Sequence, residues 1–269
     1  MVKIAGKVPN SPKANVMACV VNWSTPNDVW RLVESAEQFE PNLRFSIYQN
    51  RPPEGMEQAT RDMLDGIGRN RLHRVFSAEG DENRGHGFGT NRAADRAYVW
   101  KPKYLFLVNP DCVFTESILD RMVAFLEEDP VRCVVGPKQV DSRGRITAGG
   151  IIGTLQRPQH RWFREKDKGQ GDDIVKCPTV AGSAMLVRTE DFFEYGGLLE
   201  SKHYYSETWF NYHVQAHGRE CWYYGEAKMN HEWHQSSSMG SPLSDGSVNE
   251  DRELFRRMCD EHNPPIPRD

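Results

Sequence analysis

Short apolar segments alternate with amphipathic ones through the first half of the chain, and this alternation strongly constrains the fold. The apolar segments have the length and the branched and aromatic content of buried strands, and they cover residues 16–21, 43–48, 72–76 and 104–108. The amphipathic segments between them have helical spacing and cover residues 25–38, 56–67 and 89–99. Alternation of this kind predicts an α/β fold with a doubly wound, mostly parallel sheet.

Local signals refine the helix boundaries. Thr25 and Pro26 offer a cap and a proline for the first helical position. Thr115 is expected to cap another helix, whose apolar stripe consists of Ile118, Leu119, Met122, Phe125 and Leu126. The glycine-rich segment 83–91 precedes the helix at 89–99, and its glycines would let the backbone approach a ligand closely.

The second half of the chain does not continue the alternation of apolar and amphipathic segments. Residues 141–145 predict a hairpin turn, and the polar, basic segment 156–171 predicts a mobile surface loop. A strand is expected at 179–187 and a helix at 206–217, ended by Gly218. Residues 236–269 are expected to form a flexible tail, with a last short helix at 250–259.

Composition narrows the class of protein. The 269 residues have a net charge of −4 and a mean hydropathy of −0.69, so no overall positive charge recruits nucleic acid. The six cysteines lack CxxC spacing and are expected to be reduced. No apolar run approaches the roughly 20 residues that span a bilayer, and no signal peptide is evident. These features favour a soluble cytoplasmic protein without a transmembrane anchor.

Asn109-Pro110-Asp111 directly follows the apolar run 104–108. Ligands of open α/β sheets bind at the carboxyl ends of the strands, where this motif places one carboxylate. A carboxylate in that position suits a hard cation that also holds phosphates. The alternative is an ordinary turn aspartate before the next element.

In sequence order, these segments resemble family 2 glycosyltransferases of the GT-A fold, the group that includes rhamnosyltransferase-like enzymes. The similar segments are residues 20–24, 49–50, 83–91, 109–111, 136–150, 181–188 and 196–198, and the resemblance covers roughly residues 15–235. It implies a single GT-A domain over residues 1–235, with a nucleotide-binding part at about 15–135. A smaller, antiparallel acceptor-side part would occupy about 136–235.

The resemblance also implies site residues. The donor-binding positions would be Asn22, Ser24, Gln49, Asn50, Gly85, Gly87, Asn91, Asn109 and Asp111. The acceptor-side positions would be Gly182, Ser183 and Trp209. Asp111 and His231 would bind a divalent cation, for which Mn²⁺ and Mg²⁺ are the candidates. Glu207 would be the catalytic base; the alternative is a glutamate that only favours the positive end of a helix.

Three positions depart from the family pattern. Ser206 replaces the first acid of the pair that ends with Glu207, Gln49 replaces an aspartate that contacts the base, and Asn109 replaces the first acid of the DxD motif. A neutral Gln49 carbonyl could still accept a hydrogen bond from the base. The loss of one acid at Asn109 predicts weaker or water-mediated metal binding.

The predicted activity is inverting transfer of a sugar from a UDP-, TDP- or GDP-linked donor to a glycan, protein or lipid-linked acceptor. One alternative is a sugar-phosphate nucleotidyltransferase, although residues 21–25 lack the glycine-rich GxGxRxxP loop expected there. Another alternative is a non-catalytic glycan-binding module. Its sugar-stacking side chains would be Trp162, Tyr204, Tyr205, Trp209 and Trp233.

Overall fold

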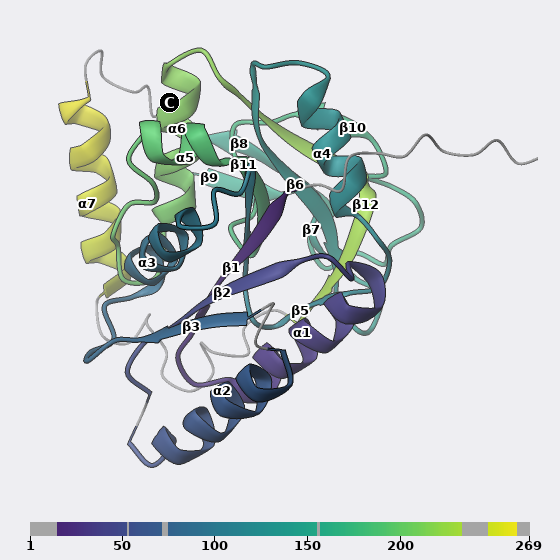
Figure 1. Cartoon of the computed structure of the whole chain (residues 1–269). Coiled ribbons are helices and arrows are strands. Elements are labelled where there is room, and N and C mark those ends of the chain that lie inside the picture. Colours follow the sequence, from purple (N-terminus) through teal and green to yellow (C-terminus); the bar gives the residue numbers. More distant parts are fainter. Residues whose placement is uncertain (1–14, 53, 72–74, 155–156, 233–246, 263–269) are drawn as a thin grey trace, which may run out of the picture.

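The computed structural model describes residues 15–52, 54–71, 75–154, 157–232 and 247–262 (Figure 1). A mixed sheet runs through the molecule in the order β10-β12-β6-β11-β4-β1-β2-β3. Its parallel part consists of β1 (Val16–Asn22), β2 (Arg44–Gln49), β3 (Val75–Glu79) and β4 (Tyr104–Val108). The strands beyond β4 are β11 (Ala184–Arg188), β6 (Arg132–Val140), β12 (Glu220–His231) and β10 (Ile174–Lys176).

Antiparallel pairing is concentrated in the second half of the chain. β11 lies antiparallel between β4 and β6, whereas β12 pairs parallel with β6. Two short strands, β5 (Cys112–Phe114) and β7 (Ile146–Ala148), pair antiparallel with β12 and β6. β8 (Ile151–Thr154) and β9 (Arg157–His160) form a separate two-stranded antiparallel sheet. The predicted combination of a doubly wound parallel sheet and an antiparallel portion is confirmed.

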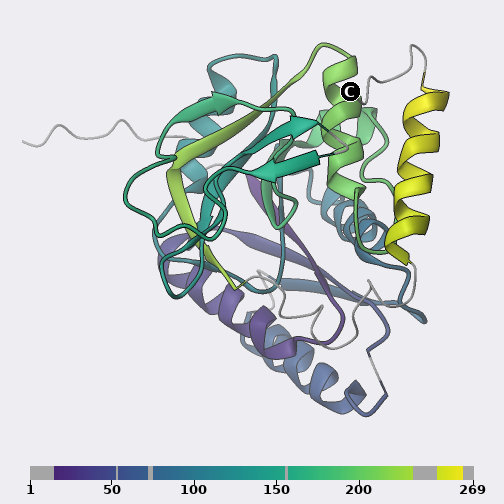
Figure 2. The same cartoon turned by 180° about the vertical axis from the view of Figure 1, so that it is seen from behind.

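Helices cover both faces of the sheet because its central strands are apolar on both sides. Ala18 and Val20 of β1 pack with α1 (Pro26–Phe39), α2 (Glu57–Arg71) and α4 (Leu119–Glu127). Met17 and Cys19 lie in a second core with α3 (His86–Tyr98), α5 (Thr189–Glu194) and α6 (Ser206–Ala216). The last helix, α7 (Ser247–Glu261), lies beside α6, as both views show (Figures 1 and 2).

The predicted start of α4 is wrong. The chain after Asp111 first forms β5, which pairs with the end of β12, so Thr115 does not cap the helix. The cap is instead tertiary, because Glu40 at the end of α1 accepts hydrogen bonds from the backbone N–H groups of Ile118 and Leu119, at 2.6 and 2.9 Å. A carboxylate placed at a helix N-terminus also complements the helix dipole.

The mobile loop predicted at 156–171 is also wrong over its described residues. This segment contains β9 and a series of turns, and it is held by a buried lysine of β6. The Lys138 ammonium, 0% exposed, donates hydrogen bonds to Asp167, Asp172 and the Gln170 carbonyl at 2.6 to 2.9 Å. Local sequence shows only polar residues here, and their partner lies in a distant strand.

Smaller differences concern boundaries. α3 begins at His86, earlier than expected, so part of the glycine-rich segment is helical. The predicted last helix is longer than expected, whereas most of the predicted flexible tail before it lies outside the described residues. All six cysteines lie in the described ranges, where they are buried and none takes part in a disulfide bond. Within the described ranges, no helix has both the length and the apolar character needed to cross a membrane.

Candidate active site

A cavity of about 400 Å³ opens where β1, β2 and β4 end. Its described lining comes from the ends of these strands and the residues that follow them, the start of α3, the segment before β11, the segment before α6 and the end of β12. Ile151 of β8 and His160 of β9 also line it. The predicted residues that line it are Asn50, Gly85, Asn109, Asp111, Gly182, Ser183, Glu207 and His231. The carboxyl ends of the strands therefore form the site, as in other open α/β sheets.

Asp111 and His231 meet on one wall of this cavity. β5 pairs antiparallel with β12, and His231 stands opposite Cys112 in that register, directly beside Asp111. His231 Nε2 lies 3.4 Å from Asp111 Oδ1, and the two residues are 5% and 9% exposed. The predicted metal pair is therefore assembled by strand pairing between distant segments.

The chemistry of this pair fits a divalent cation. A carboxylate oxygen and an imidazole nitrogen 3.4 Å apart can both contact one ion, and this donor set suits Mn²⁺. The buried Nδ1 atom of His231 has no hydrogen-bond partner among the described residues, so the ring is not committed to another polar contact. The neighbouring Cys112 thiol donates to the Ser183 carbonyl, and burial holds its pKa well above the usual range, so the protein alone does not present a thiolate there.

Glu207 reaches the same cavity from the first turn of α6. Tyr205, just before this helix, adopts a left-handed backbone conformation with φ of 69°, which turns the chain into the helix at this point. Burial raises the pKa of Glu207, while a backbone hydrogen bond opposes the shift. A carboxylate with a raised pKa is a stronger base, as proton abstraction from a hydroxyl requires.

Gly182 makes room for Glu207. A Cβ atom at position 182 would lie 2.6 Å from both Cγ and Cδ of Glu207, closer than side chains tolerate. The neighbouring Ser183 lines the cavity and donates a hydrogen bond to Gln139 at 2.6 Å, while its carbonyl accepts from the Asn109 N–H at 2.8 Å. The segment before β11 therefore supports both the metal pair and Glu207.

Asn22 and Gln49 form a buried layer beneath the cavity. Asn22 donates to the Gln49 side-chain oxygen at 2.7 Å, and Gln49 donates to the carbonyls of Trp23 and Asn50 at 3.2 and 2.6 Å. Both side chains are almost completely buried, so the Gln49 carbonyl expected to contact a base is engaged inside the protein. Ser24 is also buried, and its hydroxyl has no partner among the described residues. Asn22, Ser24 and Gln49 therefore lie behind the described residues that line the cavity and are not among them.

Asn50 is better placed to contact a ligand. It lines the cavity, and its Nδ2 donates to the Gly85 carbonyl at 3.2 Å. Its buried Oδ1 has no hydrogen-bond partner in the described part of the chain, so one acceptor remains available. Gly85 has a φ of 92°, and a Cβ there would lie 2.4 Å from the Lys202 carbonyl oxygen. Only glycine combines that backbone conformation with so close an approach.

Three predicted site residues have structural surroundings instead. The Asn91 amide donates to the Leu198 carbonyl and accepts from its N–H, both at 2.9 Å. A Cβ on Gly87 would lie 2.0 Å from the Leu199 carbonyl oxygen, so this glycine lets α3 approach the segment after β11. Trp209 packs between α6 and α7. None of the three is among the described residues that line the cavity.

The predicted site residues leave out several cationic or potentially cationic side chains of the cavity. These are His86, His160, Lys202 and His203. Burial lowers the pKa of His86 to about 4, His203 acts in the same direction and Asp111 opposes it, so His86 is neutral at pH 7. Burial and then His231 lower the pKa of His160. Isolated histidines carry no local pattern, so only tertiary contacts reveal them.

Solved structures share this architecture. GalNAc-T7 in complex with UDP, GalNAc and Mn²⁺ matches with a TM-score of 0.64 and 15% identity over 90% of this chain and 50% of its own. Residues 1–349 of TarS from S. aureus match with a TM-score of 0.60 and 12% identity, over 92% and 66% of the two chains. The fold is that of the GT-A glycosyltransferases.

A third neighbour is the mannosyltransferase PcManGT from Pyrobaculum calidifontis in complex with GDP-Man and Mn²⁺. It matches with a TM-score of 0.64 and 10% identity, over 92% of this chain and 64% of its own. The present chain therefore spans about half to two thirds of the length of these three GT-A proteins. No protein-family model and no curated protein sequence matches it.

Proposed function

We propose that this GT-A chain is an inverting glycosyltransferase that uses a nucleotide-diphosphate sugar. The observation that carries the proposal is that one cavity joins the Asp111–His231 pair to the carboxylate of Glu207. A metal-binding pair beside a carboxylate of raised pKa provides both an electrophilic and a basic group. The sequence resemblance narrows the proposal to family 2 and the rhamnosyltransferase-like enzymes. The expectation of reduced cysteines favours the cytoplasm.

The donor would lie along the ends of β1, β2 and β4. Asn50 offers its buried acceptor to an N–H group of the base, and Asn22, Ser24 and Gln49 support this wall from behind. The Gly85 turn brings backbone close to the cavity, and a small residue there leaves space for the donor. The donor is UDP-, TDP- or GDP-linked, as the sequence resemblance indicates.

Asp111 and His231 would hold the divalent cation, with Asn109 beside them. When bound, Mn²⁺ or Mg²⁺ neutralises negative charge that develops on a diphosphate leaving group. The histidines of the cavity also place ring nitrogens in its lining, and these could donate hydrogen bonds to an anionic ligand.

Glu207 acts on the acceptor. Its carboxylate takes the proton of an acceptor hydroxyl while the hydroxyl oxygen forms a bond to the anomeric carbon of the sugar. The bond from that carbon to the diphosphate oxygen breaks, and its electron pair leaves with the nucleoside diphosphate. Attack from the face opposite the leaving group inverts the anomeric centre. Gly182 and Ser183, which flank Glu207, would contact the acceptor, whether glycan, protein or lipid-linked.

The first experiment identifies the donor. Purified chain is heated with each of a panel of UDP-, TDP- and GDP-sugars, with Mn²⁺ or with EDTA, because a ligand of the folded state raises the unfolding temperature. The expected result is stabilisation by one nucleotide class that requires the metal. Stabilisation that is unchanged in Asp111→Asn would show that the metal pair is misassigned.

The second experiment tests transfer. With the identified donor and an acceptor panel, release of the nucleoside diphosphate is measured for the wild type, Glu207→Gln and a control, Glu253→Gln, an exposed glutamate of α7. Loss of a general base is expected to slow transfer by about 10²–10⁴-fold while donor binding persists. Release of pyrophosphate would instead indicate a nucleotidyltransferase. Donor or glycan binding without turnover in the wild type would indicate a binding module, and near-normal turnover in Glu207→Gln would remove Glu207 as the base.

A further inference from the structure

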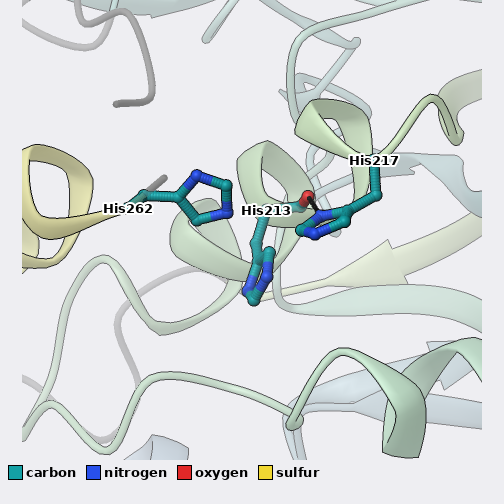
Figure 3. A group of neighbouring side chains, drawn as sticks. All are labelled: His213, His217 and His262. Carbon is teal, nitrogen blue, oxygen red and sulfur yellow. Dashed lines mark hydrogen bonds between the residues drawn. The ribbon is translucent and has the colours of Figure 1, made fainter. Parts of the chain in front are cut away.

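Three histidines converge on the side of the molecule where α6 and α7 pack together. His213 lies in the last turn of α6, and His217, four residues later, is the residue directly after this helix, so the two rings lie on the same side of its end. His262 directly follows the end of α7. One nitrogen atom from each ring lies within 4.8 Å of one from each of the others. Figure 3 shows the three rings pointing toward one another from the two helices.

The hydrogen bonds of these rings favour metal binding. His217 Nδ1 lies 2.9 Å from the His213 carbonyl oxygen, and because a carbonyl only accepts, Nδ1 carries the proton and Nε2 has a bare lone pair (Figure 3). The same arrangement orients histidine ligands in known metal sites. The buried Nδ1 of His213 has no hydrogen-bond partner among the described residues, so this nitrogen is not committed to another polar contact there.

The surroundings hold the rings in place. The Trp209 ring packs against His213 and His262, with centroid distances of 5.0 and 6.1 Å. The Tyr195 ring packs against His213 and His217, with centroid distances of 5.8 and 5.0 Å. His217 is exposed, so an ion can enter from solvent. The site is therefore partly enclosed, with the rings of Trp209 and Tyr195 beside the histidines and access to solvent at His217.

We propose that His213, His217 and His262 bind a divalent transition-metal ion of the zinc class, with water as a further ligand. Imidazole nitrogens suit Zn²⁺, Ni²⁺ and Cu²⁺, whereas the carboxylate and phosphate oxygens expected in the cavity suit Mn²⁺ and Mg²⁺. A tetrahedral zinc ion keeps its nitrogen ligands about 3.4 Å apart, so the rings move closer when it binds. This site is separate from the proposed catalytic metal and does not depend on the proposed function.

The ion would fasten α7 to α6. α7 packs through apolar contacts around Trp209, Phe255 and Cys259. Residues near its start form side-chain hydrogen bonds to the segment before α6, where Glu250 pairs with Lys202 and Arg252 donates to the Tyr205 hydroxyl. There, Asp251 accepts hydrogen bonds from the backbone N–H groups of three consecutive residues, 202–204, at 2.8 to 3.0 Å. Those residues line the cavity. Metal binding at the far end of α7 would therefore stabilise the helix that holds this wall of the cavity.

The test uses the full chain in an Asp111→Asn background, which removes a ligand of the cavity pair. Calorimetric titration with Zn²⁺ and visible absorption of Co²⁺ are expected to show a site that is retained in Glu253→Gln but weakened in His217→Ala and His262→Ala. The loss is expected to exceed about 10-fold, because even supporting groups around metal ligands contribute roughly 10–100-fold. Far-ultraviolet circular dichroism confirms folding, and the exposed His217 is the substitution that disturbs packing least.

Hydrogen exchange provides an independent readout. Zn²⁺ is expected to slow exchange in α7 and at residues 202–204 of the Asp111→Asn protein, and His217→Ala is expected to abolish this protection. Zn²⁺ affinity in both histidine variants equal to that of the parent would overturn the proposal. So would an absence of Zn²⁺ binding in the parent protein.

Discussion

Asp167 links the segment before β10 to the sheet, and replacing it by asparagine tests the observed structure of that segment. Its carboxylate accepts hydrogen bonds from Lys138 and Lys228, both at 2.6 Å. Burial would raise the pKa of Asp167, but these hydrogen bonds outweigh it and lower the pKa from 3.8 to about 2. The lowered pKa means that the ionised Asp167 carboxylate is more stable in the folded protein than in the unfolded chain.

The size of the pKa shift of Asp167 gives the expected loss of stability. At about 1.4 kcal/mol per pKa unit, a decrease from 3.8 to about 2 contributes about 2 kcal/mol to the free energy of unfolding at pH 7. Because the folded pKa is the lower one, the contribution is complete well above pH 3.8 and disappears as the pH falls through about 2. At pH 3, about 1 kcal/mol should remain. Asp167→Asn is therefore expected to lose about 2 kcal/mol at pH 7, since a neutral amide cannot replace the charge.

Urea unfolding followed by tryptophan fluorescence measures both values, at pH 7 and at pH 3. Asp172→Asn is the matched control, because Asp172 also contacts Lys138 but its side chain is 54% exposed. Exposed ion pairs typically contribute about 0–1 kcal/mol, so this control should change stability less. Equal stability of wild type and Asp167→Asn at pH 7 would refute the network, as would a difference that is the same at both pH values.

Three further predictions concern the site. Glu207→Gln should raise the free energy of unfolding at pH 8 by about 0.5–2 kcal/mol, as active-site replacements can. Burial holds the pKa of this carboxyl above 4.5, so its ionised form destabilises the folded protein. In urea titrations, the stability gained by Glu207→Gln should therefore vanish as the pH falls below 4.5. A gain that stays constant with pH would show that ionisation of Glu207 is not its cause. Gly182→Ala should reduce turnover with the identified donor, because its Cβ would clash with the Glu207 side chain, and circular dichroism checks that the variant is folded. Equal turnover in Gly182→Ala and wild type would show that Glu207 moves freely. Asp251→Ala removes the acceptor of three backbone N–H groups and should cost about 1–3 kcal/mol and speed exchange at residues 202–204, whereas unchanged exchange would show that α7 does not hold this segment.

The predictable part of the fold had local causes. The strands of the parallel half read as continuous apolar runs because both their faces are covered, and β1, β2 and β4 lie within one or two residues of their predicted bounds. The errors occurred where a distant partner decided the outcome. Hydrogen bonds to Glu40 fix the start of α4. Hydrogen bonds from Lys138 order a segment whose own sequence predicts an exposed loop.

The candidate site divides in the same way. The residues around Asp111 were enough to predict that it follows the end of a strand. The residues around Glu207 were enough to predict that it lies near the start of a helix. Burial could not be predicted for Asn22 and Gln49, whose polar side chains satisfy each other beneath the cavity. The sequence resemblance implied that both contact the donor, and that Gln49 contacts the base, but hydrogen bonding within the protein already uses the Gln49 carbonyl.

By itself, the sequence determined the alternation of strands and helices and thereby the edge of the sheet at which a ligand site forms. Periodicity and turn chemistry are local properties, so they can be read along the chain. Only the tertiary structure decided which residues share that site. Antiparallel pairing of β5 with β12 brings His231 to Asp111, and packing of α7 on α6 brings His262 to His213. Such contacts depend on the register and packing of segments far apart in sequence, which no local pattern records.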